Sequence, residues 1–216
     1  MGKKLIIKGA DFSANGIKTS FLVGTPNTDI MLAFNESAIS VGATNDNGYL
    51  ELQEIATYKS DVTSIKRLLN SKNDIRRIVL AWDLTGITEC TAICNDSTVL
   101  EELDMSGCTC PSSVNMNVLA GQCFALSKVN LSNMKISEFG DSFWQCTALK
   151  EVILRNCTLP SSLSDNFMQS CSALEKVDMR GCSASAIAMF KNKLNAQSVG
   201  GSSTWNEYTT GVLTKS

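Results

Sequence analysis

The stretch "LKEVILRNC", residues 149–157, decides the fold because the chain repeats it. It returns as "LEKVDMRGC" at residues 174–182, "LSKVNLSNM" at 126–134, "LEELDMSGC" at 100–108 and, more loosely, "IRRIVLAWD" at 75–83. The copies begin 25, 26, 23 and 25 residues apart, and all five keep the pattern L-x-x-L-x-L, with Ile, Val or Met in place of some leucines. A period of this size predicts a repeat protein built from stacked units.

Side-chain alternation gives the repeated stretch a physical meaning. In a strand the period is two, so Val152 and Leu154 are expected to point into a core, while Glu151, Ile153 and Arg155 point away from it. Each copy then supplies one short strand, and successive strands stack in parallel because one copy alone cannot bury its apolar face. The segments between the strands are rich in Ser, Thr, Asn and Gly, which suits turns and short helical pieces.

A longer motif carries a family resemblance. The chain resembles the BspA-type leucine-rich repeats of surface and adhesion proteins in Bacteroides-like bacteria through the run F-x-x-C-x-x-L-x-x-[VI]-x-[LM], present as Phe143, Cys146, Leu149, Val152 and Leu154. Three copies also close with Cys, where a leucine-rich repeat carries Asn or Cys. The resemblance covers roughly residues 72–200. It implies an α/β fold, a leucine-rich-repeat right-handed solenoid with parallel strands on the concave face and short helices or turns on the convex side, and a non-enzymatic interaction scaffold.

The chain is expected to divide into three parts. Residues 1–60 do not repeat and contain short apolar runs broken by turn residues, which predicts a small β-rich N-terminal cap or attachment segment. Residues 61–200 are expected to form the leucine-rich-repeat solenoid of about five repeats. Residues 201–216 are polar and are expected to be a C-terminal tail or cap.

Local signals place three elements inside these parts. The pair Asn47-Gly48 is typical of a hairpin turn. In "DVTSIKRLLN", residues 61–70, apolar residues recur at helical spacing, which predicts a helix leading into the first strand of the solenoid. A second helix is expected over residues 183–196, directly after the last copy of the repeat.

Composition and charge limit the classes of partner. With 44% hydrophobic and 19% charged residues, the chain can bury a sizeable core. The formal charge of −2 comes from interspersed signs without a basic block, so a nucleic-acid partner is not expected. Membrane insertion is not expected either, because no apolar stretch is long enough and the opening "MGKKLIIKGADF" lacks the core of a signal peptide. We expect a cytoplasmic location or one in a phage or other appendage. A location at the cell surface would require a signal sequence ahead of this chain.

The nine cysteines all lie between Cys90 and Cys182, inside the repeats. Alignment of the copies places six of them in two columns. The first column holds Cys123, Cys146 and Cys171, and the second holds Cys108, Cys157 and Cys182. Because columns recur on the inner side of a coil, these residues are expected to be small buried hydrophobes with free thiols. The odd total also argues against a complete set of intrachain disulfides.

Metal binding and nucleophilic catalysis are the alternative uses of these cysteines. A zinc site would be built from Cys90, Cys94, Cys108 and Cys110, although its C-x3-C and C-x-C spacings are poor for this purpose. The chain contains no histidine, so neither a Cys-His nor a Ser-His catalytic pair is available. No catalytic, cofactor-binding or metal-ligating residue is therefore expected.

Acidic residues in the repeats raise another alternative, a right-handed β-helix enzyme that cleaves polysaccharide with paired carboxylates. Its candidate residues are Glu101, Glu102, Asp104, Glu151, Glu175 and Asp178. Aligned copies give one row that reads Arg77, Glu102, Lys128, Glu151 and Lys176, and a neighbouring row that reads Arg76, Glu101, Ser127, Lys150 and Glu175. Alternating signs at strand spacing favour an ion-pair ladder on a solvated sheet over a catalytic pair.

The outward rows beyond these ladders hold the candidate binding face, which comprises Val79, Trp82, Ile153, Arg155 and Arg180. Exposed aromatic, aliphatic and arginine side chains often carry interface energy, so an acidic or carbohydrate-bearing partner is expected there. We therefore expect a non-enzymatic leucine-rich-repeat module that binds a protein or glycan partner. A structural component of a phage or mobile-element appendage is a further alternative, since the opening "KLIIKGADFSANGIK" is similar to the start of small Bacteroides phage appendage proteins.

Overall fold

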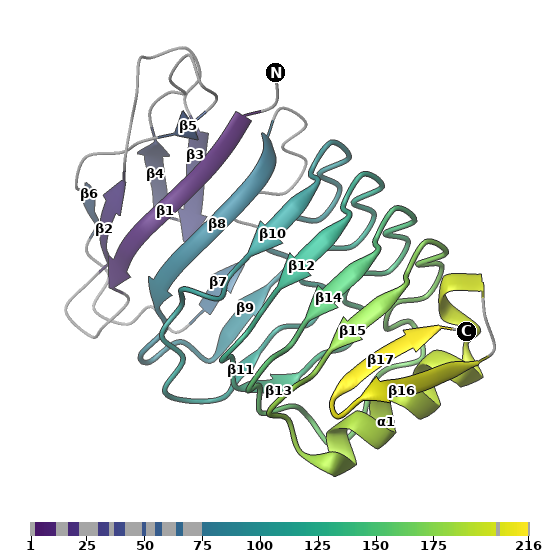
Figure 1. Ribbon diagram of the computed structural model, residues 1–216. Helices are drawn as coiled ribbons and strands as arrows, with labels where there is room; N and C mark the ends of the chain where they lie inside the picture. The colour runs from purple at the N-terminus through teal and green to yellow at the C-terminus, as the bar shows by residue number, and fades with distance from the viewer. Residues whose placement is uncertain are drawn as a thin grey trace.

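The computed structural model describes the backbone of residues 3–11, 17–21, 30–34, 37–41, 49–50, 55–57, 64–66, 75–201 and 204–215. Side chains are described for residues 76–78, 80, 84–201 and 204–215. In Figure 1 the coils formed by successive repeats stack side by side, and each coil places its strand next to the strand of the coil before it.

The long sheet contains one strand from each copy of the repeated stretch. These strands are β8 (Ile75–Asp83), β10 (Glu102–Asp104), β12 (Lys128–Asn130), β14 (Glu151–Ile153) and β15 (Lys176–Asp178). They pair in parallel and in register, which aligns the apolar residues Ile78, Leu103, Val129, Val152 and Val177. The predicted parallel stack is confirmed, and the chain forms a parallel-strand solenoid.

A second sheet takes one short strand from each of the earlier coils. Its strands are β7 (Ser64–Lys66), β9 (Glu89–Thr91), β11 (Val114–Asn115) and β13 (Ile136–Glu138), all parallel, in the order β13-β11-β9-β7. The helix predicted over residues 61–70 is therefore wrong at Ser64–Lys66. The segment pairs with β9 as a strand, although the spacing of its apolar residues is compatible with a helix. Tertiary contacts routinely override such weak local preferences.

The connections between strands are turns. Short helices, one of the two structures expected there, do not form anywhere in residues 84–183, all of which the structure describes. A left-handed residue recurs four positions before the first Leu of each later copy, at Asp96, Gln122, Gln145 and Ser170, with φ values of 57°, 56°, 57° and 65°. A right-handed helix cannot continue through such a residue, so the chain turns there instead.

The first strand of the chain continues the long sheet beyond β8. β1 (Lys3–Asp11) pairs with β8 in parallel and with β2 (Ile17–Phe21) in antiparallel, and β6 (Ile55–Thr57) follows β2. The other strands of this part are β3 (Ile30–Phe34) and β4 (Ser37–Val41), which form an antiparallel pair, and β5 (Tyr49–Leu50), which pairs with β1. Strands thus form within the apolar runs of residues 1–60, while the expected turn at Asn47-Gly48 lies outside the described residues.

A helix and a hairpin follow the last repeat. The predicted second helix is confirmed as α1 (Ala184–Ala196), which begins where Ser183 Oγ accepts a hydrogen bond from Ala186 N (3.2 Å). After the short 3-10 turn η1 (Val199–Gly201), β16 (Trp205–Thr209) and β17 (Val212–Lys215) form a hairpin, and β17 pairs with β15 in antiparallel. Residues 204–215 therefore cover the last strand of the solenoid. No described helix is long and apolar enough to cross a membrane.

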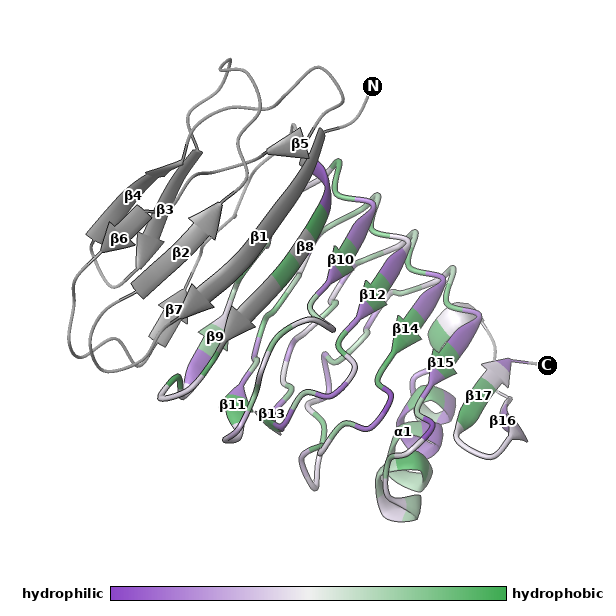
Figure 2. Cartoon of the chain, turned by 60° about the vertical axis from the view of Figure 1, so that its left-hand side comes forward, coloured by the Kyte–Doolittle hydropathy of each residue, from purple (hydrophilic) through white to green (hydrophobic). Residues whose placement is uncertain are grey.

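The core lies between the two sheets and follows the repeat. The motif positions whose side chains the structure describes are covered, including Leu149 and Leu154, and Figure 2 shows hydrophilic and hydrophobic residues side by side on β10, β12 and β15. An aromatic row formed by Phe139, Phe143, Phe167 and Phe190 packs with ring centroids 5.0 to 6.3 Å apart. Periodic burial of this kind fixes which side chains remain on the outer face.

Candidate functional site

The outer face of the long sheet carries the predicted ion-pair ladder. Strand register places Arg77, Glu102, Lys128, Glu151 and Lys176 in one row. Arg77 Nη2 lies 2.6 Å from Glu102 Oε2, and Glu151 binds both neighbours, with Lys176 Nζ at 2.9 Å and Lys128 Nζ at 3.8 Å. In the neighbouring row Arg76 pairs with Glu101. The sequence-based prediction of alternating charges on facing strands is confirmed.

Five of the six carboxylates considered for catalysis have polar partners in this sheet. Glu101, Glu102 and Glu151 bind the cations of adjacent strands, while Asp104 Oδ1 accepts hydrogen bonds from the backbone N (2.9 Å) and the hydroxyl (2.6 Å) of Ser106. Partners of this kind suit a structural role in the sheet better than proton transfer to a substrate. The described coils also contain one or two strands each, whereas a polysaccharide-cleaving β-helix is expected to show three.

Three strands of the long sheet, β10, β12 and β15, end in a turn closed by a side chain. Asp104 accepts from Ser106 N, Asn130 Oδ1 accepts from Ser132 N (3.2 Å), and Asp178 Oδ1 accepts from Arg180 N (3.3 Å). Aspartate and asparagine favour such turns because they bind the backbone two residues ahead. The fourth copy has Ile153 at this position, so it lacks the Asp or Asn that the copies on either side of it carry.

That break coincides with an arginine fork on the last two strands. Arg155, two residues after Ile153, reaches the next strand, where its Nε and Nη2 donate to Asp178 Oδ2 at 2.9 and 2.7 Å. Arg180 donates from Nε to Oδ1 (2.9 Å) and from Nη2 to Oδ2 (2.7 Å) of the same carboxylate. Burial alone would raise the pKa of Asp178, but the hydrogen bonds from Arg180 and Arg155 hold it well below its ordinary value.

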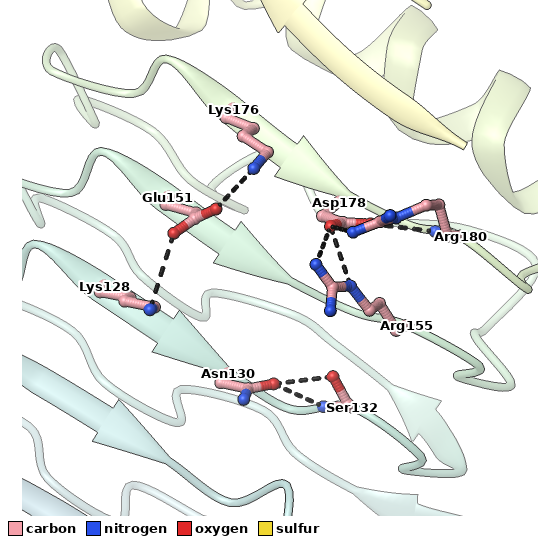
Figure 3. Close-up of polar contacts among 8 residues, drawn as sticks. All are labelled: Lys128, Asn130, Ser132, Glu151, Arg155, Lys176, Asp178 and Arg180. Atoms are coloured by element: carbon pink, nitrogen blue, oxygen red, sulfur yellow. Dashed lines mark hydrogen bonds and ion pairs between the residues drawn. The ribbon is translucent and has the colours of Figure 1, made fainter. Parts of the chain in front are cut away.

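We call the resulting cluster the basic patch, and Figure 3 shows its side chains on neighbouring strands. It consists of Lys128, Arg155, Lys176 and Arg180 together with Glu151 and Asp178. Four cations and two carboxylates leave a formal charge of +2. The cationic side chains are 40 to 52% exposed, whereas Asp178 is completely covered and Glu151 is 27% exposed. The accessible surface of the patch is therefore cationic.

The structure brings together two of the five residues predicted for the binding face. Arg155 and Arg180 meet on Asp178. Ile153 is 8% exposed, so it is not the exposed anchor that was expected, because it stands between Asn130 and Asp178 on the adjoining strands. Val79 and Trp82 belong to β8, and their side chains lie outside the described residues. The lysines of the patch were assigned only to the ladder, and the signal available in the sequence was the excess of lysines and arginines together over carboxylates at this end.

Cysteine recurs at two positions of the repeat, and the contacts of its thiol group explain why. Cys123 Sγ lies 2.8 Å from Cys94 O, Cys146 Sγ lies 3.0 Å from Ala120 O, and Cys171 Sγ lies 3.0 Å from Phe143 O. In the second column, Cys157 and Cys182 reach Leu131 O and Leu154 O of the preceding coil at 3.0 and 2.9 Å. The thiol is a weak donor that satisfies a turn carbonyl inside an apolar core.

The thiols are free and shielded. None of the nine cysteines forms a disulfide, and eight are buried, with Cys182 half-buried. Burial raises the pKa of Cys157 and of Cys171 to about 12. Among the described residues no three His, Cys, Asp or Glu side chains are grouped as a metal site requires, so the zinc alternative at Cys90 and its neighbours is not formed. The prediction of buried thiols outside disulfides is confirmed for eight cysteines, and Cys182 is partly exposed.

Comparison with known proteins finds a similarity over part of the chain. No protein-family model matches the chain, and no solved structure matches it. A putative disease resistance protein of Arabidopsis thaliana is 32% identical over 120 residues, which are 54% of this chain and 9% of that protein. The chain thus spans less than a tenth of the length of that curated relative. Together with the five-copy motif and the stacked coils, the match supports a leucine-rich-repeat solenoid.

Proposed function

We propose that this chain is a non-enzymatic interaction module that binds an acidic protein or glycan at the basic patch. The observation that carries the proposal is the unequal exposure of opposite charges. The cations of the patch reach solvent, while Asp178, the carboxylate that orients two of them, is covered. A carboxylate or sulfate of a ligand can therefore contact the exposed cationic donors without contacting the covered carboxylate of Asp178.

The arginine fork supports this proposal through its remaining hydrogen-bonding capacity. Each guanidinium has five N–H donors, and the bonds to Asp178 use the Nε and Nη2 atoms of Arg155 and Arg180. The Nη1 group of each stays available for a ligand oxygen. Asp178 also holds both planar groups in place, so less side-chain entropy is lost on binding than for two free arginines.

The sequence resemblance supports the same class of function. BspA-type repeats are surface and adhesion scaffolds, and the motif at Phe143, Cys146 and Leu149 resembles them. The partly matching plant protein is named for disease resistance. A non-enzymatic role is further supported by the carboxylates of the sheet, whose cationic and backbone partners suit a structural role better than proton transfer.

An array of synthetic glycans and peptides tests this proposal. The array contains neutral, uronate-bearing and sulfated glycans, and peptides rich in Glu, in Lys or in neither. We expect retention on acidic members, weakened by salt because the patch is exposed to solvent. Lys128→Glu should abolish retention, whereas Lys150→Glu, on an exposed position of the neighbouring row, should not. Equal retention by both variants, or retention confined to neutral members, would contradict the proposal.

A further inference from the structure

The second sheet ends at an uncovered strand. β13 is the last strand in the order β13-β11-β9-β7 and pairs only with β11 among the strands that the structure describes. The following coil touches it at a single bridge, Lys135 with Thr158, and through the bond from Ile136 N to Thr158 O (2.8 Å). Beyond this point the chain diverges at Pro160, which has no N–H to donate to a neighbouring strand.

The divergence opens a groove of about 480 Å³ along β13. Its walls include Ser137, Glu138 and Gly140 on the strand side and Pro160, Ser162 and Ser164 on the loop side. Uncovered strand edges present alternating N–H and C=O groups that bind a further extended chain, and side-chain pockets beside the edge select its residues. The groove thus lies where the next strand of this sheet would otherwise be.

The groove also has a fixed negative charge. Glu138 is the only charged residue in its lining. Asn115 Nδ2 and Asn117 Nδ2 each donate to Glu138 Oε2 at 2.8 Å, which fixes the orientation of this carboxylate in the groove lining. An oriented carboxylate beside serine hydroxyls suits a Lys or Arg side chain, because hydrogen bonds between charged groups are the strongest of their kind.

We propose that an extended peptide segment carrying Lys or Arg binds in this groove and adds to β13 as a fifth strand of the second sheet. Backbone hydrogen bonds to the edge would supply affinity, and contact of the basic side chain with Glu138 would supply selectivity. This surface belongs to a different sheet from the basic patch and prefers the opposite charge. The proposal therefore stands apart from the acidic partner proposed for the long sheet.

Selection from a display library of random octapeptides tests the inference. The full chain serves as bait, and binders to a groove-filled variant, Ser162→Trp, are removed first. Ser162 is exposed, so the substitution is compatible with folding, which a melting curve checks. We expect enriched peptides to carry Lys or Arg and to lose at least about tenfold in affinity, roughly 1.4 kcal/mol, when alternate backbone nitrogens are methylated.

Matched variants separate the groove from other sites. Glu138→Gln should weaken a selected peptide by about tenfold, whereas Thr147→Trp and Arg155→Ala, which lie outside the groove lining, should leave its affinity unchanged. Failure to enrich any peptide sensitive to Ser162→Trp would overturn the inference, and so would peptides indifferent to both backbone methylation and Glu138→Gln. If sedimentation shows dimers and Ser162→Trp abolishes them, the groove binds a second copy of the chain, and the proposal of a peptide partner is overturned. None of these outcomes depends on the basic patch.

Discussion

Substitution of Asp178 by Asn tests the arginine fork, the feature on which the basic patch is built. The change keeps the size and the turn-forming capacity of the side chain but removes its charge. Four side-chain bonds from Arg155 and Arg180 then end on a neutral amide, and two guanidinium groups face each other without a counterion. We expect a less stable protein and a more mobile pair of arginines.

The expected loss lies between two limits. Breaking a fully buried ion pair costs about 3 to 5 kcal/mol, while an exposed pair contributes about 0 to 1 kcal/mol. Here the carboxylate is completely covered but the two arginines are 44 and 52% exposed, so solvent screens part of the interaction. We therefore expect Asp178→Asn to lower the free energy of unfolding by about 2 to 3 kcal/mol at neutral pH.

The same substitution should also change how the stability of the protein depends on pH. Asp178 has a folded-state pKa below the ordinary value of about 3.9 for an unfolded chain. A depressed pKa contributes stability that is present above the unfolded value and is lost as pH falls toward the folded value. The stability difference between the parent and Asp178→Asn should therefore be constant near neutral pH and shrink once the pH falls below about 4.

Urea unfolding followed by circular dichroism measures both effects. The unfolding slope should stay unchanged, since the surface exposed on unfolding is the same. Glu175→Gln, an exposed carboxylate one strand position away from the patch, serves as the matched control and should stay within about 0.5 kcal/mol of the parent. A loss below about 0.5 kcal/mol for Asp178→Asn, or a difference that persists undiminished under acidic conditions, would refute the reasoning.

Two further outcomes are expected from the core. Leu154→Ala should lower the free energy of unfolding by about 2 to 5 kcal/mol, because Leu154 is fully covered; a loss typical of surface positions, under about 0.5 kcal/mol, would show that the strand register is wrong. Cys157 and Cys171, whose pKa values are raised to about 12 by burial, should resist a thiol reagent in the native protein and react only after unfolding. Rapid native labelling detected by mass spectrometry would show that the columns are open to solvent.

The strand register was predictable because two independent patterns agree on it. The L-x-x-L-x-L motif fixes which residues face the core, and the alternating charges fix which residues face one another across strands. Arg77, Glu102 and Lys128 accordingly lie in one row, as their alignment predicts. A one-residue slip would reverse the faces of a strand, so a buried row specifies register strongly.

The helix expected over residues 61–70 and the short helices expected between strands were wrong predictions, because the sequence lacks a local signal for the structure that forms instead. Apolar spacing within ten residues is compatible with a helix, but pairing of Ser64–Lys66 with β9 depends on a strand more than twenty residues away. The turns require left-handed backbone at polar residues such as Gln122 and Gln145. These residue types are not diagnostic of that conformation, unlike glycine.

The contacts of the candidate site were only partly predictable. Arg155 and Arg180 were identified from their outward positions, but the bonds that Arg155 makes to Asp178 of the next strand were not, because its own copy has Ile153 in place of a turn-forming side chain. The groove beside β13 depends on a strand that does not form after Thr158, and Pro160 is the one local signal of that event. Interactions at positions where the repeat is broken are harder to predict than interactions that recur in every copy.

The most direct test of the central claim is a zero-length cross-link between a carboxylate ligand and the lysines of the basic patch. Carbodiimide couples a carboxylate to an amine only when the two are in contact, and a glutamate-rich peptide serves as the probe. Peptide mass spectrometry should locate the cross-links at Lys128 and Lys176, and Arg155→Ala should reduce them. Cross-links distributed equally over Lys135, Lys150 and Lys193, with no effect of Arg155→Ala, would contradict the assignment of the patch as the binding surface.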